Sequence, residues 1–274
     1  MKSDSTILSL LETDNTLTKD LPSKHQVIPK NCLQTYICCC CNNSNDLTQH
    51  EYTSYKNLVT HCNVLFDINN DVHKTKLNTF HTYAKAKLIK HKPQLETEES
   101  GVLWKEFGFQ SEIPENDFRG GGVMSLDCMI RFSNDFSKEI GEMFNTECFC
   151  FAIIAIKLCF FLRVYFMLFD KDEMERQKKS MKINISGRKE MKRFCKGLSK
   201  DDNFFYEMFN WVMLITWKMY KERLEHGKGV LNMLKVDPII NEVIGLVEKV
   251  FGEESDEYQI KEKLRKVYVN DLKI

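Results

Sequence analysis

The chain has 274 residues, of which 43% are hydrophobic and 11% aromatic, so it can bury a core in one large domain or two modest ones. Its 39 Lys and Arg residues balance 39 Asp and Glu residues. This zero net charge argues against a nucleic-acid-binding protein, which normally carries an excess of basic residues.

Residues 1–50 have a composition typical of a weakly ordered extension. They are rich in Ser, Thr, Asn and Asp, and they contain two of the five prolines, Pro22 and Pro29. Charges interrupt the apolar runs near the N-terminus, so no secretory signal is expected. Eleven cysteines without such a signal indicate mostly free thiols in a reducing compartment. We expect a cytoplasmic protein whose helical domain covers residues 51–274.

Four consecutive cysteines, Cys38–Cys41, occur in this extension. Zinc sites need separated ligand pairs, so a metal site here would combine Cys38 and Cys41 with His50 or His61. S-acylation is a second interpretation, and it would add peripheral membrane contact to a cytoplasmic protein. An unmodified Cys-rich segment is a third interpretation, and all three stay open at this point.

From about residue 52 onward, apolar residues recur at spacings of three and four, which predicts helices. One of them is expected to end at Gly108, because glycine commonly follows the last helical turn. Pro238 suits the first turn of a later helix. No segment alternates as a strand does, so the predicted fold class is all-α. The expected helices cover 55–66, 74–89, 96–108, 123–136, 148–169, 203–224, 236–251 and 256–268.

Residues 148–169, CFCFAIIAIKLCFFLRVYFMLF, are long enough to span a bilayer. Lys157 and Arg163 lie inside this stretch, and each would cost roughly 2.5–3.5 kcal/mol near the bilayer centre. Their spacing of six positions corresponds to about 240° around a helix, so one polar stripe cannot hold both. We therefore predict a buried central helix whose two long cations reach the surface.

Residues 171–197 are locally basic: ten Lys or Arg minus four Asp or Glu give a net charge of +6. Such a segment can face an acidic partner or anionic lipid. The interpretation that the sequence favours is a solvated loop followed by the exposed face of a helix. Because the segment directly follows the apolar stretch, a role near a membrane stays open.

The chain contains no motif of a self-contained hydrolase. The glycines at 120–122 are followed by Val-Met-Ser rather than by GK[ST], so they do not form a Walker phosphate loop. The seven histidines form no H-E-x-x-H pattern, and no nucleophile elbow occurs. We therefore expect neither a cofactor nor a catalytic metal.

One arginine stands at an unusual place between two expected helices. Arg119 directly precedes three glycines and follows Asp117 by two residues, within WKEFGFQSEIPENDFRGGG at 104–122. Glycine permits backbone conformations closed to other residues and lets a partner approach closely. Gln110 and Asp117 are candidate partners of the guanidinium. Residue chemistry alone favours a structural arginine that joins two helices through Asp117 over an arginine presented to a partner.

The same segment resembles the signature of the ELMO (engulfment and cell motility) domain family. That signature has Trp, three residues, Gly, an aromatic residue and Gln, followed by Pro, Thr-Asp, one residue, Arg-Gly-x-Gly and Leu. Asn116 replaces the usual Thr, and Lys157 replaces a frequent Asn in the central apolar helix. The matching positions are Trp104, Gly108, Phe109, Gln110, Pro114, Asp117, Arg119, Gly120, Gly122 and Leu126.

This resemblance covers residues 55–250 and implies a single multi-helix ELMO-type domain. Large members of the family carry further domains and scaffold Dock-type exchange factors for Rac. Short members are GTPase-activating proteins for Arf and Arf-like GTPases, and they act through an arginine of the signature. The short chain, the lack of a PxxP ligand and the retained Arg119 resemble the short branch.

The short branch implies that Arg119 is a catalytic arginine supplied in trans to a GTP-bound Arf-family GTPase, with the other signature residues in support. The GTPase would bring the magnesium, the nucleotide and the attacking water, so the chain needs no cofactor of its own. The alternative is a non-catalytic scaffold that binds a small GTPase or a Dock-type exchange factor in Rac signalling.

Overall fold

The computed structural model describes residues 47–146, 148–170, 173, 176, 185–226, 236–253 and 256–269. These residues contain helices and turns but no strand, which confirms the predicted all-α fold class. Residues 1–46 of the expected weakly ordered extension, including Cys38–Cys41, lie outside the described residues, whereas Gln49 and His50 already belong to the first described helix. A domain boundary near residue 50 therefore stays a prediction.

Local signals set the starts of the first two helices. Thr48 caps α3 through a reciprocal capping box with Glu51, and the Asn70 side chain accepts hydrogen bonds from the first turn of α4. The first half of the fold comprises α3 (Gln49–Cys62), α4 (Asp71–His91), η2 (Pro93–Leu95), α5 (Ser100–Glu106), η3 (Pro114–Arg119), α6 (Gly122–Asp135) and α7 (Ser137–Asn145). The second half comprises α8 (Phe151–Tyr165), α10 (Arg188–Lys200), α11 (Phe204–Glu225), α12 (Val236–Gly252) and α13 (Glu257–Val269).

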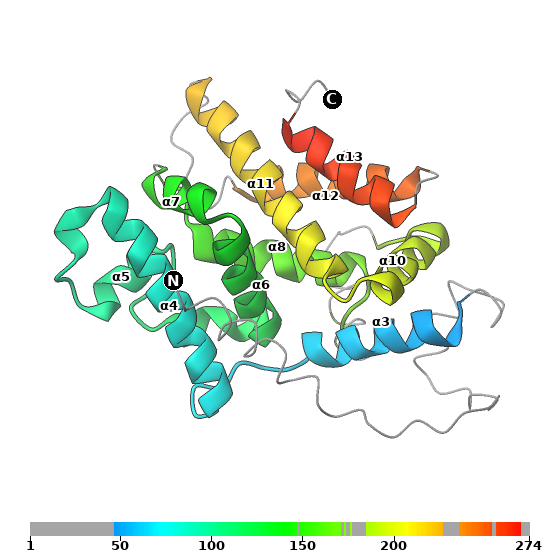
Figure 1. Ribbon diagram of the computed structural model, residues 1–274, viewed down its shortest axis with the longest axis horizontal. Coiled ribbons are helices and arrows are strands. Elements are labelled where there is room, and N and C mark those ends of the chain that lie inside the picture. Colours follow the sequence, from blue (N-terminus) through cyan, green and yellow to red (C-terminus); the bar gives the residue numbers. More distant parts are fainter. Residues whose placement is uncertain are drawn as a thin grey trace.

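The helices α6 and α8 lie at the centre of the molecule and pack against each other (Figure 1). Helices α4 and α5 cover one side, and α11 to α13 cover the opposite side. Helix α3 lies along α10 and also reaches α6. The segment between α5 and α6, which carries Arg119, therefore connects the α4–α5 side to the central helix pair.

The central position of α8 follows from its composition. Most of its residues are apolar and buried, as the sequence predicts. No helix within the described ranges is both long enough and apolar enough to cross a bilayer. Lys157 does reach the surface, where its Nζ pairs with Asp237 at 2.6 Å.

The predicted position of Arg163 is wrong. Arg163 is only 4% exposed and does not extend to solvent. Its guanidinium lies 4.0 Å from the centre of the Phe169 ring and donates hydrogen bonds to two backbone carbonyls. A buried guanidinium needs such partners, because an unpaired buried charge is strongly destabilising.

Helix α3 ends four residues earlier than the predicted bound at residue 66. The side-chain amide of Asn63 donates to the carbonyl of Val59 and to that of Leu168. The carbonyl of Val64 then accepts from the N–H of Val123, at the start of α6. These contacts with other parts of the chain stop the helix, although the apolar spacing continues beyond it.

Candidate functional site

The first half of the signature builds a helix end. After α5, the N–H of Phe109 donates to the carbonyl of Trp104, and the N–H of Gly108 donates to that of Lys105. This pair of bonds is a Schellman motif, which needs a left-handed residue at the glycine position. Gly108 has φ +90°, and the Trp104 and Phe109 rings lie 5.3 Å apart, as the hydrophobic contact of this motif requires. The predicted helix end at Gly108 is confirmed.

Gly108 also brings this turn against the start of α8. The carbonyls of Phe107 and Gly108 accept hydrogen bonds from the N–H groups of Ala152 and Ile153. These N–H groups lie in the first turn of α8, where an α-helix has no acceptors of its own. A β-carbon on Gly108 would lie 2.5 Å from the backbone of Phe151, so no larger residue fits.

Aromatic side chains continue this anchor to the residue before Arg119. The Phe109 and Phe118 ring centroids lie 5.8 Å apart, and those of Phe118 and Phe66 lie 4.9 Å apart. Phe118 is buried, whereas Arg119 beside it is exposed. The arginine is therefore attached to a residue whose position is fixed by packing on two sides.

Asp117 closes the loop that leads to η3. Its Oδ2 accepts the backbone N–H of Gln110 at 2.9 Å. Partial burial raises the pKa of Asp117, while this hydrogen bond and the charge of Arg119 act in the opposite direction. Asp117 thus holds the backbone of the segment 110–117 closed. The Gln110 side chain, which the sequence offered as a partner of the guanidinium, is exposed.

Arg119 has a different partner from the predicted one. Its Nη2 donates to Oδ1 of Asn116 at 3.1 Å, one turn earlier in η3. Within the described part of the chain, Arg119 forms no ion pair. The expected clamp between two helices through an Arg119–Asp117 ion pair is therefore absent from this geometry. Arg119 is an exposed cation held by one neutral side chain.

The glycines after Arg119 are packed, with one exception. Gly122 has φ +59°, and a β-carbon there would lie 2.5 Å from the Val64 carbonyl oxygen. A β-carbon on Gly121 would lie 2.3 Å from Oγ of Ser125. At Gly120 the nearest atom would be a Phe160 ring carbon at 3.8 Å, which is ordinary contact. The three glycines permit unusual backbone conformations, but only Gly120 has room for a β-carbon.

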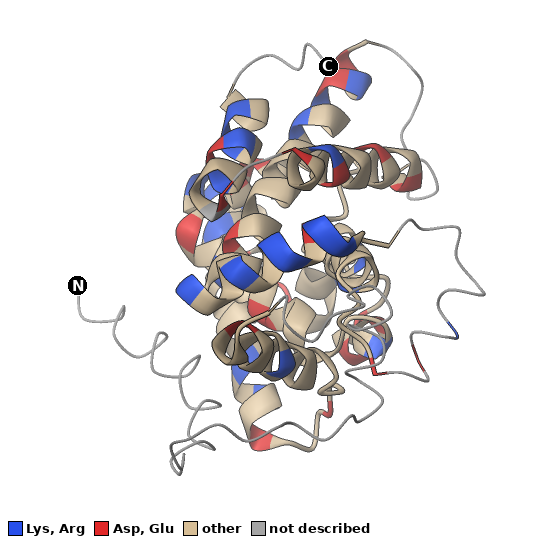
Figure 2. Cartoon of the chain, turned by 90° about the vertical axis from the view of Figure 1, so that its right-hand side faces the viewer, with Lys and Arg blue, Asp and Glu red and all other residues tan. Residues whose placement is uncertain are grey.

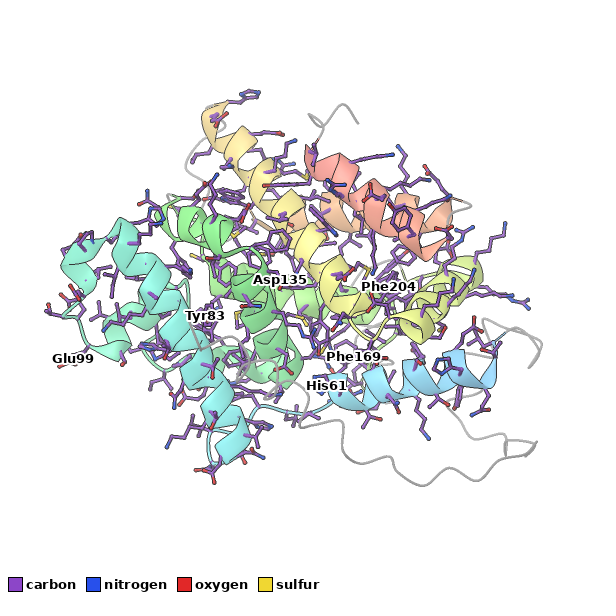
Figure 3. All side chains as sticks on the ribbon, in the orientation of Figure 1. His61, Tyr83, Glu99, Asp135, Phe169 and Phe204 are labelled. Atoms are coloured by element: carbon purple, nitrogen blue, oxygen red, sulfur yellow. The ribbon has the colours of Figure 1, made fainter. Side chains whose placement is uncertain are left out.

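Arg163 holds the two glycines next to Arg119. Its Nη1 donates to the carbonyls of Gly120 and Gly121, at 3.1 Å each. Phe169, whose ring stacks on the Arg163 guanidinium, lies near the C-terminal end of α3 close to His61 (Figure 3). The buried Arg163 thus fixes the backbone that directly follows the exposed Arg119. The signal that could have revealed this role is a charged residue in the middle of an apolar helix.

The comparison with known protein families agrees with this architecture. The ELMO/CED-12 family matches residues 56–234, which is more than half of the chain and includes the whole Arg119 segment. The chain belongs to the ELMO/CED-12 family. The resemblance inferred from the Arg119 segment is thereby confirmed.

Two ELMO proteins of Dictyostelium discoideum match part of the chain. ELMO domain-containing protein C is 43% identical over 51 residues, which make up 18% of this chain and 8% of that protein. ELMO domain-containing protein B is 37% identical over 59 residues, 20% of this chain and 21% of that protein. The matched segments thus span less than a quarter of either relative. No solved structure matches the chain.

The ELMO signature divides into buried and exposed positions in this structure. The exposed or half-exposed positions are Gln110, Asp117, Arg119 and Gly120. The buried positions are Trp104, Gly108, Phe109, Pro114, Gly122 and Leu126. Only the first group can contact another protein, and Arg119 is its only cation. The described residues contain no cluster of His, Cys, Asp and Glu suited to a metal, and Cys38–Cys41 lie outside them.

Gly122→Ala is expected to lower the free energy of unfolding by roughly 1–3 kcal/mol, because a residue with a β-carbon is strained at positive φ. Here the β-carbon would also meet the Val64 carbonyl. Gly120→Ala is the matched control, since Gly120 has φ −91° and a β-carbon there would make only an ordinary contact. Urea unfolding of both variants measures the difference. Equal destabilisation by the two substitutions would contradict this account of the loop.

Arg163→Met is expected to lower the free energy of unfolding by about 2–3 kcal/mol, because hydrogen bonds from a charged donor contribute more than neutral ones. Lys157→Met, on the same helix, is the control. Its ion pair with Asp237 is partly exposed to solvent, so the expected change is below about 1 kcal/mol. If urea unfolding gives the two variants the same stability, Arg163 does not hold the loop.

Proposed function

We propose that this chain is a GTPase-activating protein for an Arf-family small GTPase, and that Arg119 enters the GTPase nucleotide site in trans. The observation that carries the proposal is an exposed arginine on a rigid base. Membership of the ELMO/CED-12 family links the chain to small-GTPase signalling. The choice of Arf and Arf-like GTPases rests on the likeness to the short branch of that family.

The chemistry of GTP hydrolysis explains why an arginine suits this role. Negative charge develops on the transferring phosphoryl group and the leaving oxygen, and an arginine supplied by a partner can accelerate the reaction roughly 10³–10⁵-fold. A guanidinium remains charged and offers forked donors that match phosphate oxygens. The GTPase supplies magnesium, nucleotide and water, so the proposal requires no cofactor from this chain.

The contacts of Arg119 are compatible with transfer to a phosphate. Its hydrogen bond to Asn116 is made to a neutral acceptor. A phosphate oxygen is a stronger acceptor for a guanidinium than an amide oxygen, because it carries negative charge and a phosphate can accept two parallel hydrogen bonds from the guanidinium fork. The bond to Asn116 can therefore be exchanged for a bond to the nucleotide without first breaking an ion pair.

The fixed backbone around Arg119 reduces the entropic cost of positioning its side chain in a partner. The backbone on its N-terminal side is fixed by buried Phe118, and the backbone after it is fixed by Arg163. A side chain that is already positioned loses less conformational freedom on binding. Exposed apolar residues, Leu65 and Ile113, lie in the two loops that adjoin this segment, and they supply contact area for a partner.

Single-turnover GTP hydrolysis by a panel of Arf and Arf-like GTPases, with and without the full chain, tests the proposal. Stimulation of at least one panel member is the expected result. Binding of a GTP-loaded GTPase without any stimulation would overturn it and would favour the scaffold function. The same panel should include Rac, since the scaffold alternative predicts association with Rac signalling through a Dock-type exchange factor.

A further inference from the structure

Helix α10 carries a face of one charge sign. Its exposed side chains include five cations and no acid. Figure 2, which views the side of the molecule where α10 lies, shows this face as mostly blue. The five exposed cations are Arg188, Lys189, Lys192, Lys196 and Lys200.

The five cations share one face because of their spacing. Four of them recur at every fourth position, and all five fall within about 120° of the helix circumference, along about 18 Å of its length. Like charges four residues apart oppose helix formation. The opposite face cannot rotate outward, because it is packed in the core through Met191, Phe194, Cys195 and Leu198.

Glu190, the acid of α10, is turned away from the basic face. Glu190 is half-buried, with one carboxylate oxygen 2.6 Å from the β-carbon position of Gly187 and the other 3.7 Å from that of Gly252 in α12. The pKa of Tyr165 is raised mainly by burial and secondly by the negative charge of Glu190. The carboxylate therefore lies between α10 and α12.

The neighbouring helix α3 adds one exposed cation. It packs along α10, and its exposed charged side chain is that of Lys56. Its acid, Glu51, is half-buried and accepts the backbone N–H of Thr48 at 2.7 Å in the capping box. The two helices thus expose cations but no acid.

We propose that the basic face of α10, together with Lys56, docks the protein on a bilayer that contains anionic phospholipids. A protein partner normally requires apolar or aromatic anchors at the centre of an interface. The exposed large apolar side chains of the described residues are Val64, Leu65, Val72, Val102, Ile113, Tyr258 and Val269, and none lies on α10. An anionic membrane needs only a sufficient number of cations near its surface.

The basic face is separate from Arg119 and does not depend on the proposed GTPase activation. Arg119 belongs to η3, whereas the cations lie on α10 and α3. Membrane docking would use these cations to hold the domain on a lipid surface, and it would not involve Arg119. The two functions can therefore be lost independently.

The test is co-sedimentation of the full chain with vesicles of phosphatidylcholine alone and of phosphatidylcholine mixed equally with phosphatidylserine. The wild type is expected to bind only the anionic vesicles and to dissociate as salt is raised, because screening shortens the range of the attraction. Lys189→Glu/Lys192→Glu is expected to weaken binding at least about tenfold, since each basic residue near such a surface contributes about fivefold.

The control is Lys74→Glu/Lys90→Glu, which makes the same charge change at exposed positions of α4. It is expected to bind anionic vesicles as the wild type does. Equal weakening by both double variants would overturn the proposal, because only net charge would then matter. Failure of the folded wild type to bind anionic vesicles would also overturn it. Circular dichroism checks each fold, and a Lys189→Gln/Lys192→Gln variant replaces the Glu pair if it unfolds.

The α10 variants also separate this inference from GTPase activation. Lys189→Glu/Lys192→Glu is expected to stimulate GTP hydrolysis normally in the absence of vesicles. Arg119→Lys is expected to sediment with anionic vesicles as the wild type does. If the α10 variant loses stimulation in solution, its face contacts the GTPase rather than lipid, and the membrane proposal is wrong.

Discussion

Arg119→Lys is expected to abolish stimulation of GTP hydrolysis while leaving the fold intact. Lysine keeps the positive charge but has no planar fork to contact two phosphoryl oxygens together. The arginine supplied by a partner typically accounts for roughly 10³–10⁵ in rate, so even partial loss is easily measured. Single-turnover hydrolysis with the GTPase that responds to the wild type gives the comparison.

The control for this prediction is Arg265→Lys. Arg265 is exposed on α13, outside the residues that match the family, and its partner is Glu262 three positions earlier. The control should stimulate hydrolysis as the wild type does. Circular dichroism and the thermal midpoint should be unchanged in both variants, because Arg119 is exposed and its described contact is a single hydrogen bond to Asn116. Normal stimulation by Arg119→Lys would exclude this arginine as the catalytic group.

A binding measurement separates catalysis from scaffolding. If Arg119 acts mainly in the transition state, Arg119→Lys should bind the GTP-loaded GTPase nearly as well as the wild type and fail only in the rate. A scaffold would show this pattern, binding without stimulation, already in the wild type. The two hypotheses therefore differ in the wild type as well as in the variant.

The parts of the site that sequence could predict are those set by local chemistry. Gly108 marks a helix end because a left-handed residue is needed there, and the Trp104 and Phe109 rings contact each other within the same turn. Both features involve residues within five positions of each other. The apolar composition of residues 148–169 likewise predicted the central helix α8 and its burial.

The parts that sequence could not predict depend on distant residues. Arg163 donates hydrogen bonds to the carbonyls of Gly120 and Gly121, which lie 43 and 42 positions earlier in the chain. Nothing in the sequence of either segment indicates the other. Charge alone places an arginine at the surface, but here two carbonyls and the Phe169 ring stabilise it inside. The Arg119 partner was missed for another reason. Asn116 appeared only as a departure from the signature, whereas its side chain is the one that holds the guanidinium.

Asp127→Ala is expected to lower the free energy of unfolding by about 3–5 kcal/mol, because removing one member of a buried ion pair is strongly destabilising. Asp127 is 1% exposed and Lys76 is 2% exposed. The Lys76 Nζ lies 3.1 and 3.2 Å from the two carboxylate oxygens, and Nε2 of His61 lies 2.9 Å from Oδ2. Urea unfolding measures the loss.

The double variant Lys76→Met/Asp127→Leu tests the cause. Replacing both members of a buried ion pair with apolar residues is often neutral or stabilising, so the double variant should be more stable than Asp127→Ala. Such a gain would show that the effects of the two substitutions are not additive, as expected for residues in contact. A double variant less stable than Asp127→Ala would show that packing volume, rather than the charge pair, determines the effect.

Asp127→Ala and Arg119→Lys are expected to fail in different ways. Asp127 joins α6 to the ends of α3 and α4, five residues after Gly122, so its loss loosens the helices behind the Arg119 loop. Arg119 remains in the Asp127→Ala variant. The molecules of this variant that stay folded should therefore still stimulate hydrolysis, in proportion to their number. Arg119→Lys should stay fully folded and inactive. If stimulation per folded molecule also disappears in Asp127→Ala, the ion pair positions the arginine as well as stabilising the fold.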